Sequence, residues 1–241
     1  MPVRAFISKE LPSELGEKLR EAGVEFLALP LIKTVPVEFN PQEVLSFSPE
    51  VLIFSSKNGV KFFFNRLSPE RLRGVEVVAV GSSTAQELKK LGFSPIIPAN
   101  FSAEGLVELL KGWEVKGKRF LVVRPKKARS LVQNFLKERG AEVREVVVYQ
   151  TLPSEEVKEE LLNFFSGKVD YAAFTSPSNF DSFLKLAGRE RLEGVKVIPI
   201  GHVTQKAVEK AGLKSLPPPQ EYTLNGVVSY LLRLVREGLQ A

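Results

Sequence analysis

Hydroxyl-bearing residues follow four short apolar runs of this sequence, at points where amphipathic segments begin. The four turns are Ser55-Ser56, Gly81-Ser82-Ser83-Thr84, Thr175-Ser176 and Gly201-His202-Val203-Thr204. This pattern predicts a strand that leads into a helix, whose first turn has free backbone N–H groups and a positive dipole end. Each turn alone is typical of an ordinary helix cap, as when Ser176 is followed by Pro177. Together the four turns favour a site for carboxylates or phosphates.

Three more residues could belong to such a site. Ser102 in "NFSAEGL" and Thr223 in "EYTLNGV" are expected to cap glycine-containing helices, and Tyr222 precedes the second cap. Tyr149 ends the apolar segment "EVREVVVYQT". A phenol has a reference pKa near 10 and can donate a proton at neutral pH. A tyrosine that only packs at a domain boundary is the alternative interpretation.

The composition excludes several kinds of chemistry. The chain has no cysteine and a single histidine, His202, which removes thiolate nucleophiles, cysteine metal sites and histidine-rich metal sites. Neither a P-loop nor a GxGxxG motif follows any apolar run, so nucleotide binding is not supported. These absences argue against such metal sites and against nucleotide cofactors.

The net charge of +6 and the pI of about 9.4 favour anionic ligands. Nucleic acid would need a contiguous basic face, and only "RPKKAR" at 124–129 is a basic cluster. No apolar run is long enough to cross a bilayer, and the first residues lack a signal-peptide pattern. We expect a cytoplasmic monomer that binds a small molecule, with neither nucleic acid nor membrane as partner.

The elements that must position these residues alternate along the chain. Strands are expected at 3–8, 51–56, 75–80, 119–123, 142–151, 171–176 and 195–201, with helical patterns between them, and a strand at 24–37 is expected to continue into an extended segment. Alternation at this spacing predicts parallel sheets with right-handed crossovers.

The chain also contains an internal repeat. Residues 51–92 align without a gap to 171–212, and 13 of the 42 positions are identical. Ser56, Gly81 and Thr84 are among these, and all three lie in the expected strand-to-helix turns. The segment 3–31 resembles 119–148 in pattern, so the chain consists of two similar α/β halves.

Two domain arrangements fit this order. The halves could be consecutive domains, or the second domain could be inserted into the first. An inserted domain requires the chain to pass between the two domains twice. Extended proline-containing segments that could do so occur at 33–42 and 149–156. We therefore expect an α/β fold with two similar parallel-sheet βαβ domains, 1–36 plus 152–241 and 37–151, joined by two extended strands, with a ligand cleft between them.

The ordered set of motifs resembles the uroporphyrinogen-III synthase family over nearly the whole chain. The motifs are "FSSKNGV", "VAVGSSTAQELKKLGF", "RFLVVRPKKARSLVQNFLKERGAEVREVVVYQT", "FTSPSNFDSFL", "VIPIGHVTQKAVEKAGL" and "EYTLNGVVSYLL". The resemblance implies a lyase without a cofactor that cyclises hydroxymethylbilane, a linear tetrapyrrole with eight carboxylates, to uroporphyrinogen III. It also implies an inserted second domain and a substrate held by backbone amides and hydroxyls.

The resemblance assigns roles to individual residues. Tyr149 matches the tyrosine proposed to assist departure of the hydroxyl. The expected substrate-binding residues are Ser55, Ser56, Gly81, Ser82, Thr84, Ser102, Arg124, Arg129, Thr175, Ser176, Gly201, His202, Thr204, Tyr222 and Thr223. One departure is the first turn, where many members have Thr-Arg-Pro and this chain has Ser8-Lys9-Glu10. Any cationic contact from that turn would come from Lys9, so the first turn is left out of the expected site.

Two other functions remain open at this point. A non-catalytic two-domain protein that binds an anionic metabolite would share every cleft feature, but it gives no reason for Tyr149. A nucleic-acid-binding protein would fit the high pI alone.

Overall fold

The computed structural model describes residues 1–240 and divides into two units, each described here by itself. Unit 1 combines residues 1–33 with the segment that starts at Leu152. Unit 2 is the continuous stretch Thr34–Thr151, so its first residue is 34, where the sequence suggested 37.

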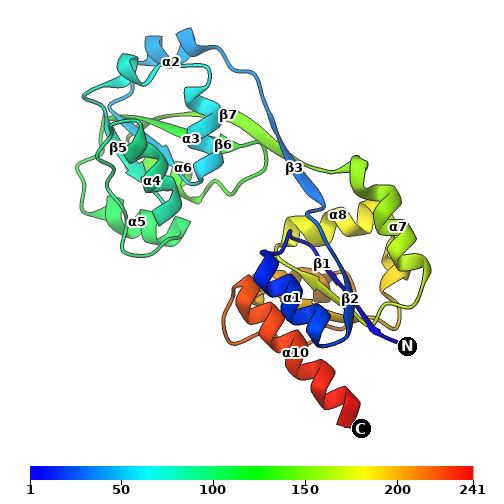
Figure 1. Ribbon diagram of the computed structural model, residues 1–241. Helices are drawn as coiled ribbons and strands as arrows, with labels where there is room; N and C mark the ends of the chain where they lie inside the picture. The colour runs from blue at the N-terminus through cyan, green and yellow to red at the C-terminus, as the bar shows by residue number, and fades with distance from the viewer. Residues whose placement is uncertain (241) are drawn as a thin grey trace. The chain divides into compact units, whose positions relative to one another are not determined.

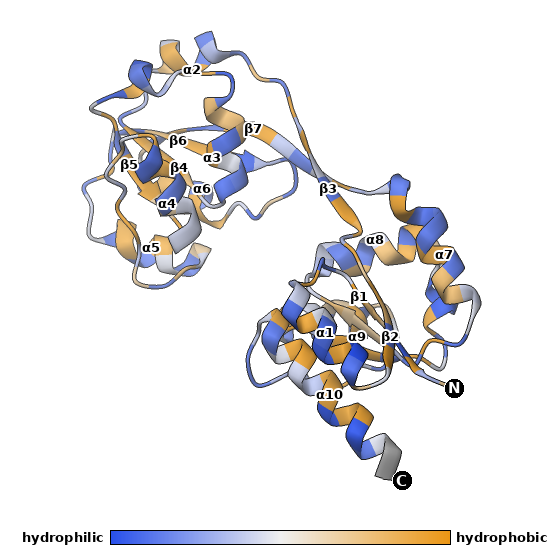
Figure 2. Ribbon diagram, in the orientation of Figure 1, coloured by the Kyte–Doolittle hydropathy of each residue, from blue (hydrophilic) through white to orange (hydrophobic). Residues whose placement is uncertain are grey.

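Unit 1 is built on a four-stranded sheet (Figure 1). The order across it is β2 (Val24–Ala28), β1 (Val3–Ile7), β8 (Tyr171–Phe174) and β9 (Lys196–Pro199). Neighbouring strands are parallel, so the first strand of the chain pairs directly with a strand from its last third. The strands are short and almost wholly apolar because helices cover both faces (Figure 2).

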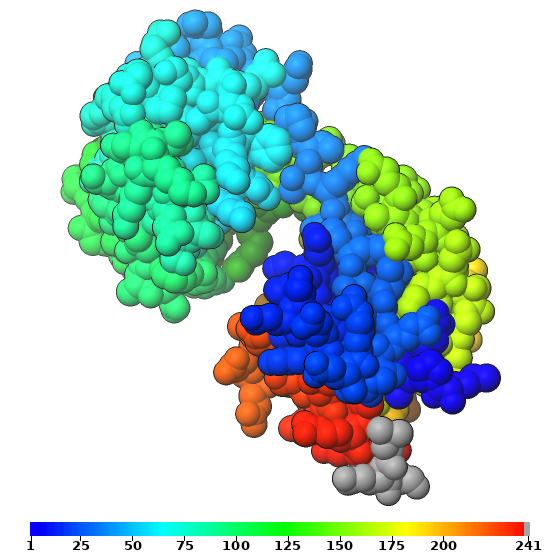
Figure 3. All heavy atoms as spheres, in the orientation of Figure 1, coloured from blue at the N-terminus to red at the C-terminus, as the bar shows by residue number. Residues whose placement is uncertain are grey.

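Alternate strand residues of unit 1 pack against helices on opposite faces. Phe6, Ala172 and Phe174 contact α7 (Lys158–Ser166), α8 (Pro177–Ala187) and α9 (His202–Lys210). Ala5, Ile7 and Ala173 contact α1 (Ser13–Glu21) and α10 (Leu224–Gln240). The blue N-terminal and red C-terminal atoms therefore lie side by side in Figure 3.

Unit 2 is built on a five-stranded sheet. Its order is β3 (Ile32–Pro36), β7 (Glu142–Pro153), β6 (Arg119–Pro125), β4 (Val51–Phe54) and β5 (Glu76–Ala79). The strands β7, β6, β4 and β5 are parallel. Helices α2 (Pro41–Phe47), α3 (Lys57–Phe64) and α4 (Ser82–Lys90) cover one face, and α5 (Ala103–Lys111) and α6 (Leu131–Glu138) cover the other.

The two segments that connect the units pair with each other. The N–H of Val37 donates to the carbonyl of Val148, and the N–H of Ser154 donates to that of Leu31. The two segments therefore run antiparallel. The strand expected from residue 24 and the extended segment that continues it to residue 37 are two separate strands, because the chain leaves one sheet after Ala28 and enters the other at Ile32. Pro30 lies in this break, where its missing N–H interrupts no ladder.

The internal repeat is present in the structure element by element. Each element of the first copy begins 120 residues before its counterpart in the second: β4 before β8, α3 before α8, β5 before β9, and α4 before α9. The short 3₁₀ helices η1 (Pro69–Leu72) and η3 (Arg189–Leu192) keep the same offset, while η2 (Glu155–Val157) follows the second connecting segment.

Candidate active site

Two of the four predicted turns lie at the switch points of the two sheets. In unit 1 the chain moves from β1 outward to β2, and from β8 outward to β9 on the other side. In unit 2 it moves from β4 to β5 and, on the other side, from β6 to β7. Ligands of open parallel sheets bind outside the carboxyl ends of strands at such points. The turns after β8 and β4 occupy these positions.

A pair of hydroxyls occupies the switch point of unit 1. Ser8 Oγ accepts the N–H of Thr175 at 2.8 Å, and the two side-chain oxygens lie 3.0 Å apart. Ser8 is fully buried. The expected site left Ser8 out with the rest of the first turn, although its position directly after β1 was the available signal. Lys9, the next residue, is exposed.

Ser176 caps α8, and its side chain accepts two hydrogen bonds. Its Oγ accepts the backbone N–H of Asn179 and the Nδ2–H of the same residue, both at 3.0 Å. The Oδ1 atom of Asn179 accepts the N–H of Leu31 at 2.9 Å. Because Ser176 Oγ accepts both bonds, its own proton is available to a ligand.

The turn after β9 contacts the segment before α10. A Cβ atom added at Gly201 would lie 2.7 Å from Cδ2 of Tyr222, so only glycine fits against that ring. The imidazole of His202 meets the Tyr222 ring edge-on at 5.6 Å, and Thr223 Oγ1 accepts the N–H of Gly226. The structure thus brings Gly201 and His202 into contact with Tyr222, which is followed by the cap Thr223.

The side chain of Tyr149 contacts the turn between β4 and α3. Its hydroxyl lies 3.0 Å from Ser56 Oγ, which also accepts the N–H of Gly59 as the cap of α3. The Tyr149 ring is buried and stacks on Phe62 at 5.5 Å. Ser55, next to the cap, is exposed.

Thr84 and Thr204 occupy equivalent places after the two glycine turns. Gly81 has a φ of 97°, a left-handed conformation that favours glycine, and Ser82 then begins α4. Both threonines are 2% exposed. Among residues 1–238, whose side chains the structure describes, no side-chain hydrogen bond reaches either hydroxyl, yet no buried side-chain N or O atom there lacks a partner. Each hydroxyl therefore keeps at least a small exposed area.

The remaining predicted residues engage protein groups. Ser102 caps α5 by accepting the N–H of Gly105 at 3.0 Å. Arg129 pairs with Glu104, and this hydrogen bond lowers the pKa of the Glu104 carboxyl.

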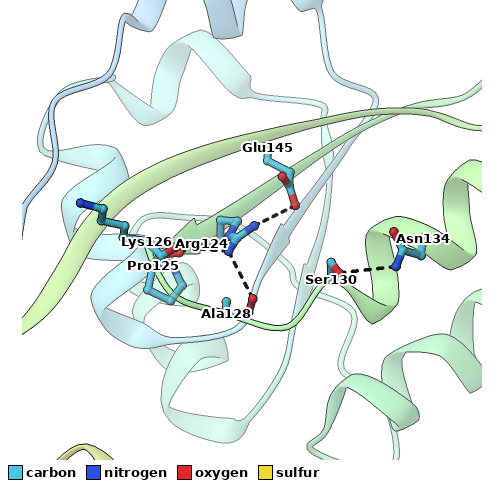
Figure 4. Close-up of polar contacts among 7 residues, drawn as sticks. All are labelled: Arg124, Pro125, Lys126, Ala128, Ser130, Asn134 and Glu145. Carbon is cyan, nitrogen blue, oxygen red and sulfur yellow. Dashed lines mark hydrogen bonds and ion pairs between the residues drawn. The ribbon is translucent and has the colours of Figure 1, made fainter.

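Arg124 holds its own loop together (Figure 4). Its guanidinium donates to Glu145 at 3.1 Å and to the carbonyls of Pro125, Lys126 and Ala128 at 3.2 to 3.3 Å. The N–H of Lys126 in turn donates to the carbonyl of Tyr149 at 2.8 Å. The loop is thus shaped by Arg124 and attached to the strand that carries Tyr149.

Two classes of feature are not found in residues 1–240. No group of three or more acidic, histidine or cysteine side chains is arranged to hold a metal ion. No helix of that part combines the length and the apolar character needed to cross a membrane.

This geometry defines a class: two-unit α/β proteins with hydroxyl-lined strand ends in both units. The family model of uroporphyrinogen-III synthase HemD matches residues 13–229. The uroporphyrinogen-III synthase of Chlorobaculum parvum is 32% identical over 211 residues, which cover 82% of this chain and 84% of the relative. A putative uroporphyrinogen-III synthase of Methanothermobacter thermautotrophicus is 30% identical over 241 residues, covering 92% and 94%.

Solved structures share the fold. Uroporphyrinogen-III synthetase from Helicobacter pylori superposes with a TM-score of 0.66 at 22% identity, covering 97% of this chain and 100% of that one. A mutant uroporphyrinogen III synthase from Thermus thermophilus gives 0.64 at 20% identity, covering 98% and 99%. The chain belongs to the uroporphyrinogen-III synthase family, whose members are lyases of porphyrin biosynthesis that act on a small tetrapyrrole. This membership supports the enzyme over the non-catalytic binding protein.

Proposed function

We propose that this chain converts hydroxymethylbilane to uroporphyrinogen III, with loss of water and inversion of ring D through a spirocyclic pyrrolenine. The observation that carries the proposal is the placement of Tyr149. Its phenol is buried against Phe62 and hydrogen-bonded at a helix N-terminus, at the strand ends where ligands of such sheets bind.

Tyr149 is the proposed proton donor for the first step. The C–O bond of the hydroxymethyl group breaks with its electron pair on oxygen, which takes the phenol proton and leaves as water. The pyrrole N–H proton is lost as the neutral azafulvene forms, and it returns to the phenolate. The later steps rearrange bonds without net gain or loss of atoms.

The substrate's carboxylates are proposed to bind at the predicted turns of each unit. The hydroxyls of Thr84, Thr204 and Ser176 each have a proton to donate, and the adjacent helix N-termini favour negative charge. The further proposed ligands are Ser55, Gly81, Ser82, Ser102, Thr175, Gly201, His202, Tyr222 and Thr223. Arg124 and Arg129 would first have to release Glu145 and Glu104.

Orientation is the main catalytic task in this proposal. The azafulvene also closes without an enzyme, to the isomer with ring D uninverted. Holding the terminal rings in the geometry of spiro attack therefore decides the product. Proton donation by Tyr149 supplies the smaller part of the rate.

The test is to incubate the protein with hydroxymethylbilane and to separate the isomers after oxidation by chromatography. We expect isomer III well above the amount in a control without enzyme. An isomer ratio equal to that control would overturn the proposal. We also propose a cytoplasmic monomer without nucleic-acid or membrane partner, and light scattering after size exclusion measures the monomer mass.

A further inference from the structure

The two repeat-related caps, Ser56 and Ser176, differ in their second hydrogen bond. Each serine accepts the backbone N–H three residues later at 3.0 Å. In unit 1 that later residue is Asn179, whose Nδ2 also donates to Ser176. In unit 2 the same position is Gly59, which has no side chain, and the Tyr149 hydroxyl occupies the second place on Ser56.

Gly59 is not required by backbone conformation. It lies inside α3, and its φ is not among the positive values of the chain. A Cβ atom there would lie 3.2 Å from Ser56 Oγ, tighter than most contacts of real Cβ atoms. A glycine costs about 1 kcal/mol relative to alanine within a helix. Its presence therefore keeps the space beside Ser56 open.

The same helix also orients the phenol ring. Ser56, Gly59 and Phe62 are spaced three residues apart, so they lie along one side of the start of α3. Phe62 stacks on the Tyr149 ring with an interplanar angle of 20°, while Ser56 contacts the hydroxyl. Together these contacts set both the plane of the ring and the position of its oxygen.

We propose that Ser56 is a positioning residue that acts on the substrate through Tyr149 rather than as a carboxylate ligand, and that Gly59 is the residue that permits this contact. Because Ser56 Oγ accepts the Gly59 N–H, its own proton can be donated to the phenol oxygen. As Tyr149 gives its proton to the departing hydroxyl, Ser56 and the α3 N-terminus stabilise the phenolate that forms. The inference rests on the proposed function.

The experiment gives the turn between β4 and α3 the asparagine that the equivalent turn between β8 and α8 carries. In Gly59→Asn the new side chain competes with Tyr149 for Ser56, as Asn179 occupies Ser176. Ser56→Ala removes the contact, and Ser56→Thr keeps both the cap and the hydroxyl. Lys61→Asn, at an exposed position on the same helix, is the matched control.

We expect Ser56→Ala and Gly59→Asn to lower kcat about 10- to 100-fold with KM nearly unchanged. Ser56→Thr should keep kcat within about threefold, and Lys61→Asn should leave both constants unchanged. The double variant Ser56→Ala/Tyr149→Phe should be no slower than Tyr149→Phe alone, because one residue acts through the other. A rise in KM without loss of kcat, or multiplied losses in the double variant, would show a separate ligand role and overturn the proposal.

A second readout needs no turnover. With ¹³Cζ-labelled tyrosine, the Tyr149 signal, assigned by its loss in Tyr149→Phe, should shift alike in Ser56→Ala and Gly59→Asn and stay in place in Lys61→Asn. A signal that does not move in either variant refutes the contact. If the wild type makes no isomer III, the proposed function fails, while this signal still decides whether Ser56 positions the phenol.

Discussion

Single hydroxyls in this chain can serve both capping and binding. Ser102 and Ser176 each accept a backbone N–H three residues on, which uses a lone pair and leaves the proton free. A hydroxyl in this state can donate to an acidic group that arrives at the same helix end. The cap interpretation and the ligand interpretation of these turns are therefore compatible at each residue.

Replacing Tyr149 with Phe removes the proposed proton donor but keeps the ring on Phe62. We expect turnover to fall by no more than the roughly 10²- to 10⁴-fold usual for a general acid. Steady-state kinetics with hydroxymethylbilane measure this fall.

The control is Tyr230→Phe, which removes a phenol hydroxyl from α10. It should leave kcat unchanged. Wild-type turnover in Tyr149→Phe would remove Tyr149 from the mechanism, whereas a product shifted to the uninverted isomer would assign it to positioning.

Replacing Thr84 or Thr204 with Val keeps the volume of a buried side chain and removes its hydroxyl. Because neither hydroxyl bonds another side chain among residues 1–238, the melting temperature should change little. KM should rise roughly 10-fold for each variant, the loss of one hydrogen bond to a charged group. Thr34→Val, at an exposed position, is the control, and an unchanged KM in both buried variants would exclude these threonines from the site.

At the scale of elements, the loops before α5 and α10 depend on close backbone approach. A Cβ added at Gly105 would overlap the carbonyl oxygen of Asn100, and one at Gly226 would overlap that of Glu221. We expect Gly105→Ala and Gly226→Ala to lower the free energy of unfolding by about 1–3 kcal/mol each, measured by chemical denaturation.

Gly112→Ala is the matched control for these helix-end glycines. Gly112 has an ordinary φ of −82° and no contact closer than 3.7 Å for a new Cβ. This variant should be neutral or stabilise by up to about 1 kcal/mol. Equal effects at all three positions would mean that close approach is not the cause.

At the scale of the whole molecule, each unit has its own packed core on both faces of its sheet. We expect residues 34–151 to fold alone, with a cooperative thermal transition in circular dichroism. Unit 1 should fold when Lys33 is joined to Leu152 through Asn-Gly, because the Ser154-to-Leu31 bond places these two ends opposite each other. Non-cooperative melting of both products would show that the units depend on each other.

Alkaline stability should depend on Tyr171 in β8. Burial, with a smaller effect from the Asp170 charge, raises the pKa of this phenol. The folded protein keeps the proton at pH values where the unfolded chain has lost it, so this group's stabilisation declines as pH rises above about 10. Tyr171→Phe should flatten the fall in the free energy of unfolding above pH 10, and an unchanged slope would contradict the assignment.

The sequence by itself determined the alternation of elements, the repeat at offset 120 and the caps, because these depend on local periodicity and on the first turn of each helix. It also placed Tyr149 among the candidate site residues.

Only the tertiary structure decided which residues far apart in the sequence come into contact. Ser8 joins Thr175 because β1 pairs with β8, and Tyr149 reaches Ser56 because β7 and β4 flank the same central strand, β6. The sequence allows Arg124 to be a substrate ligand, whereas in the structure its guanidinium donates to Glu145 and to the carbonyl of Ala128 in its own loop. Strand order and side-chain partners arise from packing of the whole sheet, and no local pattern in the chain encodes them.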